Sequence, residues 1–207
     1  MPAAPSVPPG RPSPPPSRLV VAITGATGVI YGVRLLEALG SVPGVETHLV
    51  LSGPGKRTLV EETDHTVRDV ERLAHVVHDV KDIGASIASG SFHTAGMVVA
   101  PCSIRTAAAI ASGVTGNLVT RAADVTLKEG RPLILLVRET PLHVGHLRTL
   151  VVLAEIGATV LPPMPAFYHR PKGIDDLVNH TIARVLDRLG LPHDLAVGRP
   201  AAGPAPS

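Results

Sequence analysis

Short apolar runs alternate with longer amphipathic segments through the middle of the chain. The runs are rich in Val, Leu and Ile, as expected for strands that are buried on both faces. They predict strands at residues 19–24, 46–51, 97–100, 133–137 and 159–161, with a weaker candidate at 76–80.

The segments between these runs have the spacing of helices that cover one apolar face. They predict helices at 30–39, 56–63, 106–112, 118–129, 141–156 and 174–189. Thr140-Pro141 is expected to start its helix, because a hydroxyl suits the N-cap and proline suits the first helical position. The alternation predicts an α/β fold with three layers, in which a Rossmann-like (flavodoxin-like) parallel sheet carries helices on both faces.

The two ends of the chain differ in composition from the middle. Residues 1–17 contain eight prolines and are predicted to be a disordered or polyproline tail. Residues 192–207 are predicted to be a flexible C-terminal tail. Residues 18–191 are left as the α/β domain.

Composition narrows the function classes. The 207 residues carry a formal charge of +2, too small to predict nucleic-acid binding by bulk electrostatics. The chain has no uninterrupted apolar run long enough to predict a membrane span. The single cysteine excludes an intrachain disulfide and fits a reducing compartment, so a cytoplasmic location is expected.

The first predicted strand runs into a glycine turn, Gly25-Ala26-Thr27-Gly28. Glycines let a backbone approach an anion, and the following helix offers free N–H groups and the positive end of its dipole. The turn therefore predicts a phosphate site. Glycines that serve only the geometry of the turn are the alternative.

The second predicted strand indicates which kind of phosphate compound binds. A dinucleotide fold usually places Asp or Glu at this strand end to hold a ribose. Here the strand is followed by Ser52-Gly53, so NAD is disfavoured. Ser52 instead favours a mononucleotide.

Two further strand ends carry polar residues. Ser103 to Thr106 open a helix with hydroxyls and free N–H groups, directly after Cys102. Cys102 is interpreted as an apolar interior residue, with a nucleophile as the alternative. At the next strand end, Arg138 can bind a phosphate and Glu139 can move a proton, and the alternative is a local ion pair.

Three other cationic residues and a tyrosine are also candidate site residues. Arg121 and Lys128 are seven residues apart and share a face of one predicted helix, which would otherwise be a solvated face. Tyr168 ends a proline-rich apolar segment that could form a lid. Arg184, on the last helix, could face that segment or solvent.

Four segments of the chain together resemble the UbiX-like flavin prenyltransferases. They are GATGVIYGVRLLEAL, GMVVAPCSIRTAAAIASG, NLVTRAADVTLKEGRPLILLVRETPLHVGHL and GATVLPPMPAFYHRP. The resemblance implies an enzyme that joins a dimethylallyl group, from dimethylallyl monophosphate, to N5 and C6 of reduced FMN without a metal. It also implies a homo-oligomer, expected to be a dodecamer, whose prenylated FMN serves a UbiD-like decarboxylase.

The resemblance also assigns roles to individual residues. FMN would be held by Gly25, Ala26, Thr27, Ser52, Ser103, Ile104, Arg105, Thr106 and Arg138. The dimethylallyl phosphate would be bound by Tyr168, Arg184, Arg121 and Lys128. Glu139 would lie at the reacting centre, and Glu62, or its neighbour Glu61, would be the acid near the phosphate.

Two other functions remain as alternatives. An FMN-dependent cysteine decarboxylase would share the fold, but that group has a PASANT-type segment where this chain has PCSIRT. A non-catalytic flavin-carrying protein would not need the second set of cations. The chain has no Trp, and therefore lacks the C-terminal Trp of some UbiX-like enzymes, which leaves the identity of the prenyl donor open.

Overall fold

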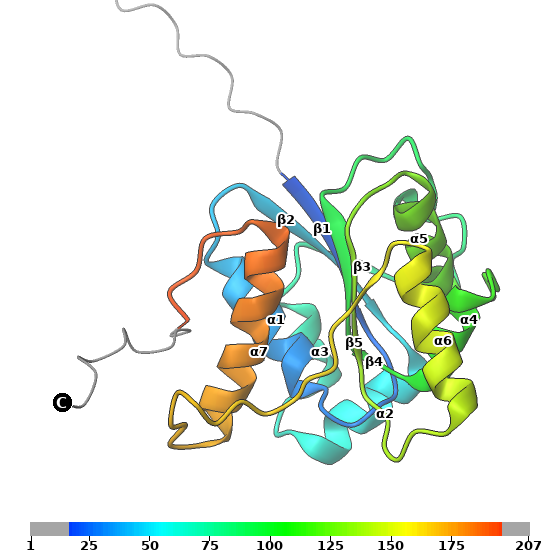
Figure 1. Ribbon diagram of the computed structural model, residues 1–207. Coiled ribbons are helices and arrows are strands. Elements are labelled where there is room, and N and C mark those ends of the chain that lie inside the picture. The colour runs from blue at the N-terminus through cyan, green and yellow to red at the C-terminus, as the bar shows by residue number, and fades with distance from the viewer. Residues whose placement is uncertain (1–16, 196–207) are drawn as a thin grey trace, which may run out of the picture.

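A computed structural model describes residues 17–195 and contains one sheet of six parallel strands (Figure 1). The strands are β1 (Ser17–Ile23), β2 (Val45–Leu51), β3 (Val76–His78), β4 (Gly96–Cys102), β5 (Leu133–Val137) and β6 (Thr159–Val160). Their order in the sheet is β3-β2-β1-β4-β5-β6, and every neighbouring pair is parallel. The predicted Rossmann-like (flavodoxin-like) α/β fold is confirmed.

Helices cover both faces of the sheet, with α1 and α7 on one side and α4, α5 and α6 on the other (Figure 1). The helices are α1 (Ile30–Gly40), α2 (Gly53–Glu62), α3 (Val67–Glu71), α4 (Ile104–Ala111), α5 (Leu118–Lys128), α6 (Val144–Glu155) and α7 (Ile174–Leu189). A short 3-10 turn at Ser86–Ala88 completes the elements. No helix within residues 17–195 has the length and apolar character needed to cross a bilayer.

The strands are apolar because the sheet packs against two separate hydrophobic cores, one on each of its faces. Leu19, Val21 and Ile23 of β1 pack into the core under α1 and α7. Val20 and Ala22 of the same strand pack into the core on the opposite face. Because both faces are buried, β1 is a continuous apolar run and not an alternating one.

Two predicted helix starts were wrong by three residues each, and α4 begins at Ile104, two residues earlier than predicted. Helix α6 begins at Val144, because the Nδ1 atom of His143 accepts the backbone N–H groups of Gly145 (3.0 Å) and His146 (3.3 Å) and so provides the N-cap expected of Thr140. Helix α2 begins at Gly53, three residues earlier than predicted, because Ser52 Oγ accepts the N–H of Gly55.

The predicted tails fall almost entirely outside the described part of the chain. Residues 1–16 and 196–207 are not described, so the predictions for them stand as made. Residue 17 begins β1 and is hydrogen-bonded to Gly44 at the start of β2. Leu195, the last described residue, packs against the core of α1 and α7.

The chain leaves the sheet in opposite directions from β1 and β4, which are neighbours at its centre. From β1 it continues toward β2, and from β4 toward β5, so a crevice opens between the two strand ends. Thr24 closes the floor of this crevice. Its hydroxyl donates to the carbonyl of Pro101 (2.9 Å) and accepts the N–H of Ser103 (2.8 Å).

We expect Thr24→Val to destabilise the fold, because it removes both hydrogen bonds and leaves the partly buried Ser103 N–H without its acceptor. The expected loss is about 1–3 kcal/mol of unfolding free energy. Thr126→Val is the matched control, since the Thr126 hydroxyl is equally buried but bonds only to Ala122 within its own helix. Equal effects of the two substitutions in thermal unfolding at one protein concentration would contradict the role given to Thr24.

Candidate functional site

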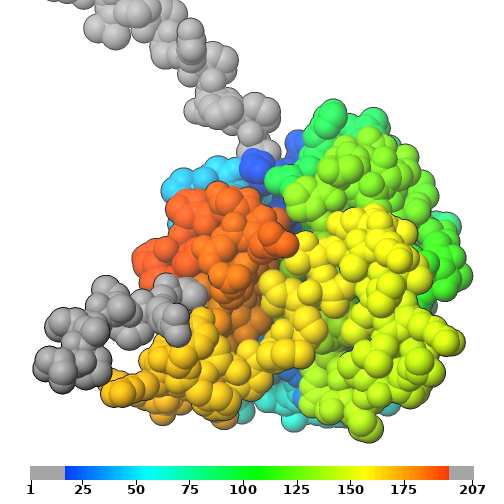
Figure 2. Space-filling model, viewed as in Figure 1, coloured from blue at the N-terminus to red at the C-terminus, as the bar shows by residue number. Residues whose placement is uncertain are grey.

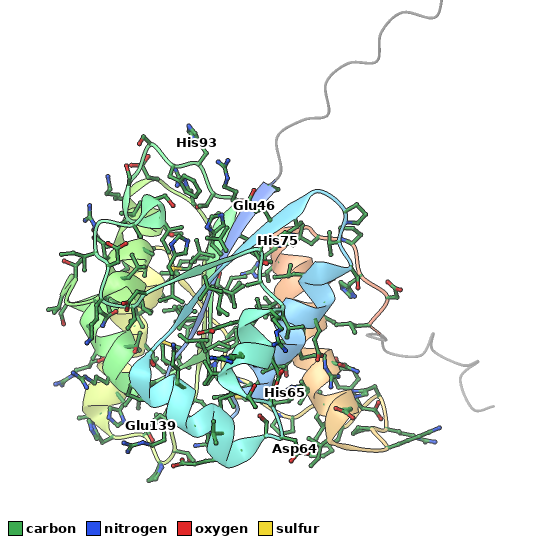
Figure 3. The ribbon with its side chains drawn as sticks, turned by 180° about the vertical axis from the view of Figure 1, so that it is seen from behind. Glu46, Asp64, His65, His75, His93 and Glu139 are labelled. Carbon is green, nitrogen blue, oxygen red and sulfur yellow. The ribbon has the colours of Figure 1, made fainter. Side chains whose placement is uncertain are left out.

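A cavity of about 590 Å³ lies at the carboxyl ends of β1, β2, β4 and β5. All the residues predicted to hold FMN line it, together with the predicted acid: Gly25, Ala26, Thr27, Ser52, Ser103, Ile104, Arg105, Thr106, Arg138 and Glu139. Figure 3 shows Glu139 at this end of the molecule, opposite Glu46 and His75. The structure therefore brings the flavin set together in one place.

The glycine turn is shaped by packing as well as by its exposure to the cavity. A Cβ atom on Gly25 would lie 2.3 Å from Pro54 Cβ, so only glycine allows the turn to contact the first turn of α2. Gly28 has a φ of +94°, a conformation that side chains rarely adopt. The turn thus packs the end of β1 against the first turn of α2.

Part of the turn is already bound to a carboxylate of the same chain. Glu62 Oε2 accepts the backbone N–H groups of Gly28 (2.8 Å) and Val29 (3.2 Å), where α1 begins without a side-chain cap. Glu62, and not Glu61, is therefore the acid at the glycine turn. Gly25, Ala26 and Thr27 are left to face the cavity.

Three other helices begin at the cavity. Ser103 caps α4 by accepting the N–H of Thr106 (3.3 Å), and Ser52 caps α2 in the same way. Asn117 caps α5 by accepting the N–H of Thr120 (3.1 Å) and lines the cavity as well. Sequence reasoning missed Asn117, although an Asn directly before a predicted helix is a typical N-cap signal. Three helix N-termini at one cavity favour an anionic ligand.

Arg138 and Glu139 form no local ion pair with each other or with any other residue in the described part of the chain. The Arg138 backbone is fixed by its N–H, which donates to the carbonyl of Cys102 (3.1 Å). Glu139 Oε1 accepts only the N–H of Thr140 (3.1 Å). The two side chains are therefore available to a ligand.

Tyr31 lies between the glycine turn and the last helix. Its ring contacts Gly28, as the Cβ position on that glycine shows. Burial raises the pKa of the Tyr31 phenol, while a hydrogen bond to Thr181 of α7 and the nearby Arg138 charge oppose that shift. Tyr31 thus connects the glycine turn to α7, a contact that the sequence did not indicate.

Cys102 is completely buried at the end of β4. Burial raises the pKa of its thiol to about 12, so the thiol stays protonated at neutral pH. The interpretation of Cys102 as an apolar interior residue is confirmed.

The predicted phosphate cations on α5 do not line the cavity. Arg121 pairs with Asp124 (2.9 Å) and Lys128 pairs with Glu129 (3.0 Å), all on or next to that helix. Such partly exposed pairs contribute little to stability.

A second cavity, of about 480 Å³, lies between β6 and α7. It is lined by His180, Arg184 and Arg188, among others, and Tyr168 adjoins it through a hydrogen bond to His180. The segment after β6 (yellow) fills the space between α7 (orange) and α6 (Figure 2). Tyr168 and Arg184 are thus close to each other but are not part of the flavin cavity.

The described residues contain no group of three or more His, Cys, Asp or Glu side chains arranged to hold a metal ion. The donors at the two cavities are hydroxyls, backbone N–H groups and arginines. They are the partners expected of phosphates.

The profile of the Flavoprotein family matches residues 11–186. Over 180 residues the chain is 58% identical to the flavin prenyltransferase UbiX of Escherichia coli K12, which covers 86% of this chain and 95% of that protein. The chain belongs to the UbiX family of flavin prenyltransferases.

Solved structures of UbiX relatives share the fold closely. A dodecameric FMN-dependent UbiX-like decarboxylase from Escherichia coli O157:H7 has a TM-score of 0.86 and 50% identity, covering 90% of this chain and all of that one. AnUbiX in complex with FMN and dimethylallyl pyrophosphate has a TM-score of 0.83 and 46% identity, with 85% and 93% covered.

We expect Glu62→Gln to destabilise this UbiX family member, because the negative charge at the start of α1 is lost while one acceptor oxygen remains. The expected loss is roughly 0.5–1 kcal/mol, since the contact is exposed. Glu61→Gln, at an exposed neighbour, is the control. If both variants unfold at the same temperature, the Glu62 contact does not stabilise the turn.

Proposed function

We propose that the chain transfers a dimethylallyl group from dimethylallyl monophosphate to reduced FMN, and that the prenylated FMN serves a UbiD-like decarboxylase. The observation that carries this proposal is the cavity at the ends of β1 and β4, which collects the whole predicted flavin set. The proposal is also supported by the membership of the chain in the UbiX family. A further support is its similarity to a UbiX enzyme solved in complex with FMN and dimethylallyl pyrophosphate.

The cavity suits FMN in size and chemistry. Its volume of about 590 Å³ lies within the range of small-molecule sites. Ser52 follows β2 where a dinucleotide-binding fold would place an acid for the ribose, and this favours a mononucleotide. Helix N-termini and Arg138 supply donors for its phosphate.

When bound, the reduced flavin supplies N5 and C6, the two atoms to which the prenyl group would be joined. In the proposed reaction the C–O bond of the prenyl phosphate breaks, and the phosphate leaves with the bonding electrons. One prenyl carbon bonds to N5, the prenyl double bond gains a proton, and the carbon at its other end bonds to C6. N5 and C6 each release a proton, so the flavin gains C5H8. The chain must therefore stabilise the leaving phosphate and move protons.

Arginine, lysine and tyrosine side chains can meet the first requirement. Positive charge and hydrogen-bond donors stabilise the negative charge that develops on a leaving phosphate. Arg138 lies in the cavity, whereas Arg121, Lys128, Tyr168 and Arg184 lie outside it in one chain. We assign these four to the prenyl phosphate, and their positions indicate that more than one subunit builds the site.

An exposed apolar face on α6 indicates where subunits meet. Val144, Leu147 and Val151 lie on one side of the helix and are 62%, 48% and 55% exposed. A face of this kind usually marks an interface. Because a UbiX relative is dodecameric, we propose a cytoplasmic homo-oligomer, expected to be a dodecamer, that buries this face and requires no metal.

Glu139 is assigned to proton transfer, because its carboxylate lines the cavity beside Arg138 and is free of ion pairs with the described residues. We expect Glu139→Gln to lower the rate of prenylation by a factor of about 10²–10⁴ while FMN stays bound. Mass spectrometry of the flavin, after incubation with FMN, a reductant and dimethylallyl monophosphate, measures the product. Glu155→Gln, at the exposed far end of α6, is the control. Product at the normal rate from Glu139→Gln would remove Glu139 from this role.

The same assay on the unaltered chain separates the alternative functions. A flavin heavier by one C5H8 unit supports the transferase, and replacing the monophosphate by the diphosphate identifies the donor. Carbon dioxide released from a peptide with a C-terminal cysteine, with the flavin unchanged, would support a cysteine decarboxylase. Bound FMN that is unchanged under every condition would support a flavin-carrying protein and contradict the proposal.

We expect Leu147→Glu to dissociate the assembly, because it places a charge in the centre of the apolar face of α6. Light scattering after size-exclusion chromatography would show smaller particles, and prenylation would be lost. Ile83→Glu, at an exposed apolar residue in a loop, is the control and should keep the assembly. Full-size, active Leu147→Glu particles would exclude this face as the interface.

A further inference from the structure

The hydroxyl of Tyr168 has a specific partner in helix α7. It lies 2.6 Å from Nε2 of His180, although the two residues come from different segments. The ring of Tyr168 is largely exposed, whereas His180 is only 8% exposed. The buried imidazole is therefore the fixed member of the pair.

Stacking holds the His180 ring in place. The ring of His169 lies parallel to it, with centroids 4.8 Å apart and an interplanar angle of 2°. The ring of Tyr168 meets it edge-on, at 5.5 Å and 80°. These contacts fix the direction in which Nε2 points.

His180 also belongs to the cationic cavity between β6 and α7. It lines this cavity with Arg184, which follows it by one helical turn on the same face of α7. Arg184 is only weakly paired, at 4.0 Å from Asp187, and the two side chains are 59% and 50% exposed to solvent. Its guanidinium is therefore available to an anion.

The charge state of His180 limits its hydrogen bonding. Burial, with the nearby His169 and Arg184, lowers the pKa of His180, so its neutral form dominates at pH 7. A neutral imidazole has one N–H donor and one acceptor. If Nε2 accepted the phenol proton, Tyr168 would have no donor left for an anion.

We propose that His180 is the positioning residue for Tyr168, with its Nε2–H donating to the phenol oxygen so that the phenol O–H points to the phosphate of the prenyl donor beside Arg184. The inference rests on the proposed function, because it gives Tyr168 a phosphate to bind. It adds a residue that touches neither the flavin nor the donor and acts through Tyr168.

The test uses the full chain in its assembled state. His180→Leu removes the donor, whereas His180→Gln keeps an N–H group at a similar reach. Each is combined with Tyr168→Phe in a double-mutant cycle. His93→Leu, at an exposed histidine at the opposite end of the molecule from Glu139 (Figure 3), is the control.

Two readouts are needed. Steady-state prenylation gives KM for dimethylallyl monophosphate and kcat. Calorimetry gives the affinity for the same compound, and for inorganic phosphate, of protein loaded with oxidised FMN, where no transfer takes place. His180→Leu is expected to raise KM and weaken donor binding by about tenfold, with kcat and FMN affinity changing far less. His180→Gln should stay within about threefold of the unaltered chain, and His180→Leu should have no further effect in the Tyr168→Phe background.

Several results would overturn the inference. If His180→Leu and His180→Gln weaken donor binding equally, the His180 ring contributes only packing and not a hydrogen bond. If the effects of His180→Leu and Tyr168→Phe on donor affinity multiply in the double variant, the two residues act independently. If His180→Leu fails to assemble, His180→Gln and the cycle built on it decide the matter. If the unaltered chain makes no prenylated flavin, the proposed function fails, and equal phosphate affinities of the unaltered chain and His180→Leu would then reject the positioning role separately.

Discussion

The hydroxyl of Thr24 fixes the two central strand ends on which the site depends. It bonds to the Pro101 carbonyl and the Ser103 N–H, and so sets the end of β1 against the end of β4. The chain turns away from the sheet in opposite directions at these two points, and the crevice between them forms the cavity in which we propose that FMN binds. The glycine turn and the start of α4 both begin within a few residues of this contact.

Around this centre, two groups of residues suited to anions lie in different parts of the fold. At the glycine turn, Glu62 binds the N–H groups at the start of α1, so the start points of α2, α4 and α5 face the cavity instead. The second group of cations lies on α5 and α7, outside that cavity. A flavin phosphate and a prenyl phosphate would thus be held by different parts of the fold. Assembly of several subunits could place the cations of one chain beside the flavin cavity of another.

The sequence predicted the centre of the sheet well because β1, β4 and β5 are apolar and buried along most of their length. The edge strand β3 gave a weaker pattern because it is only partly buried. The sequence also predicted most of the residues that line the first cavity, since these follow directly after the strands, but it missed Asn117 at the start of α5. It could not predict contacts between distant segments, such as Thr24 with Ser103, Glu62 with the glycine turn, or Tyr168 with His180. The start of α6 was missed because a histidine supplies its cap, and α3 was missed because five residues give too short a pattern.

We propose that FMN occupies the crevice at the ends of β1 and β4, and that a neighbouring subunit completes a second anion site. An experimental structure of the assembled protein with FMN and inorganic phosphate would test both points. We expect the flavin between Ser52, Ser103 and Arg138, and a phosphate beside it that contacts cations from more than one subunit. A flavin bound elsewhere, or a phosphate held by one chain alone, would contradict the proposal.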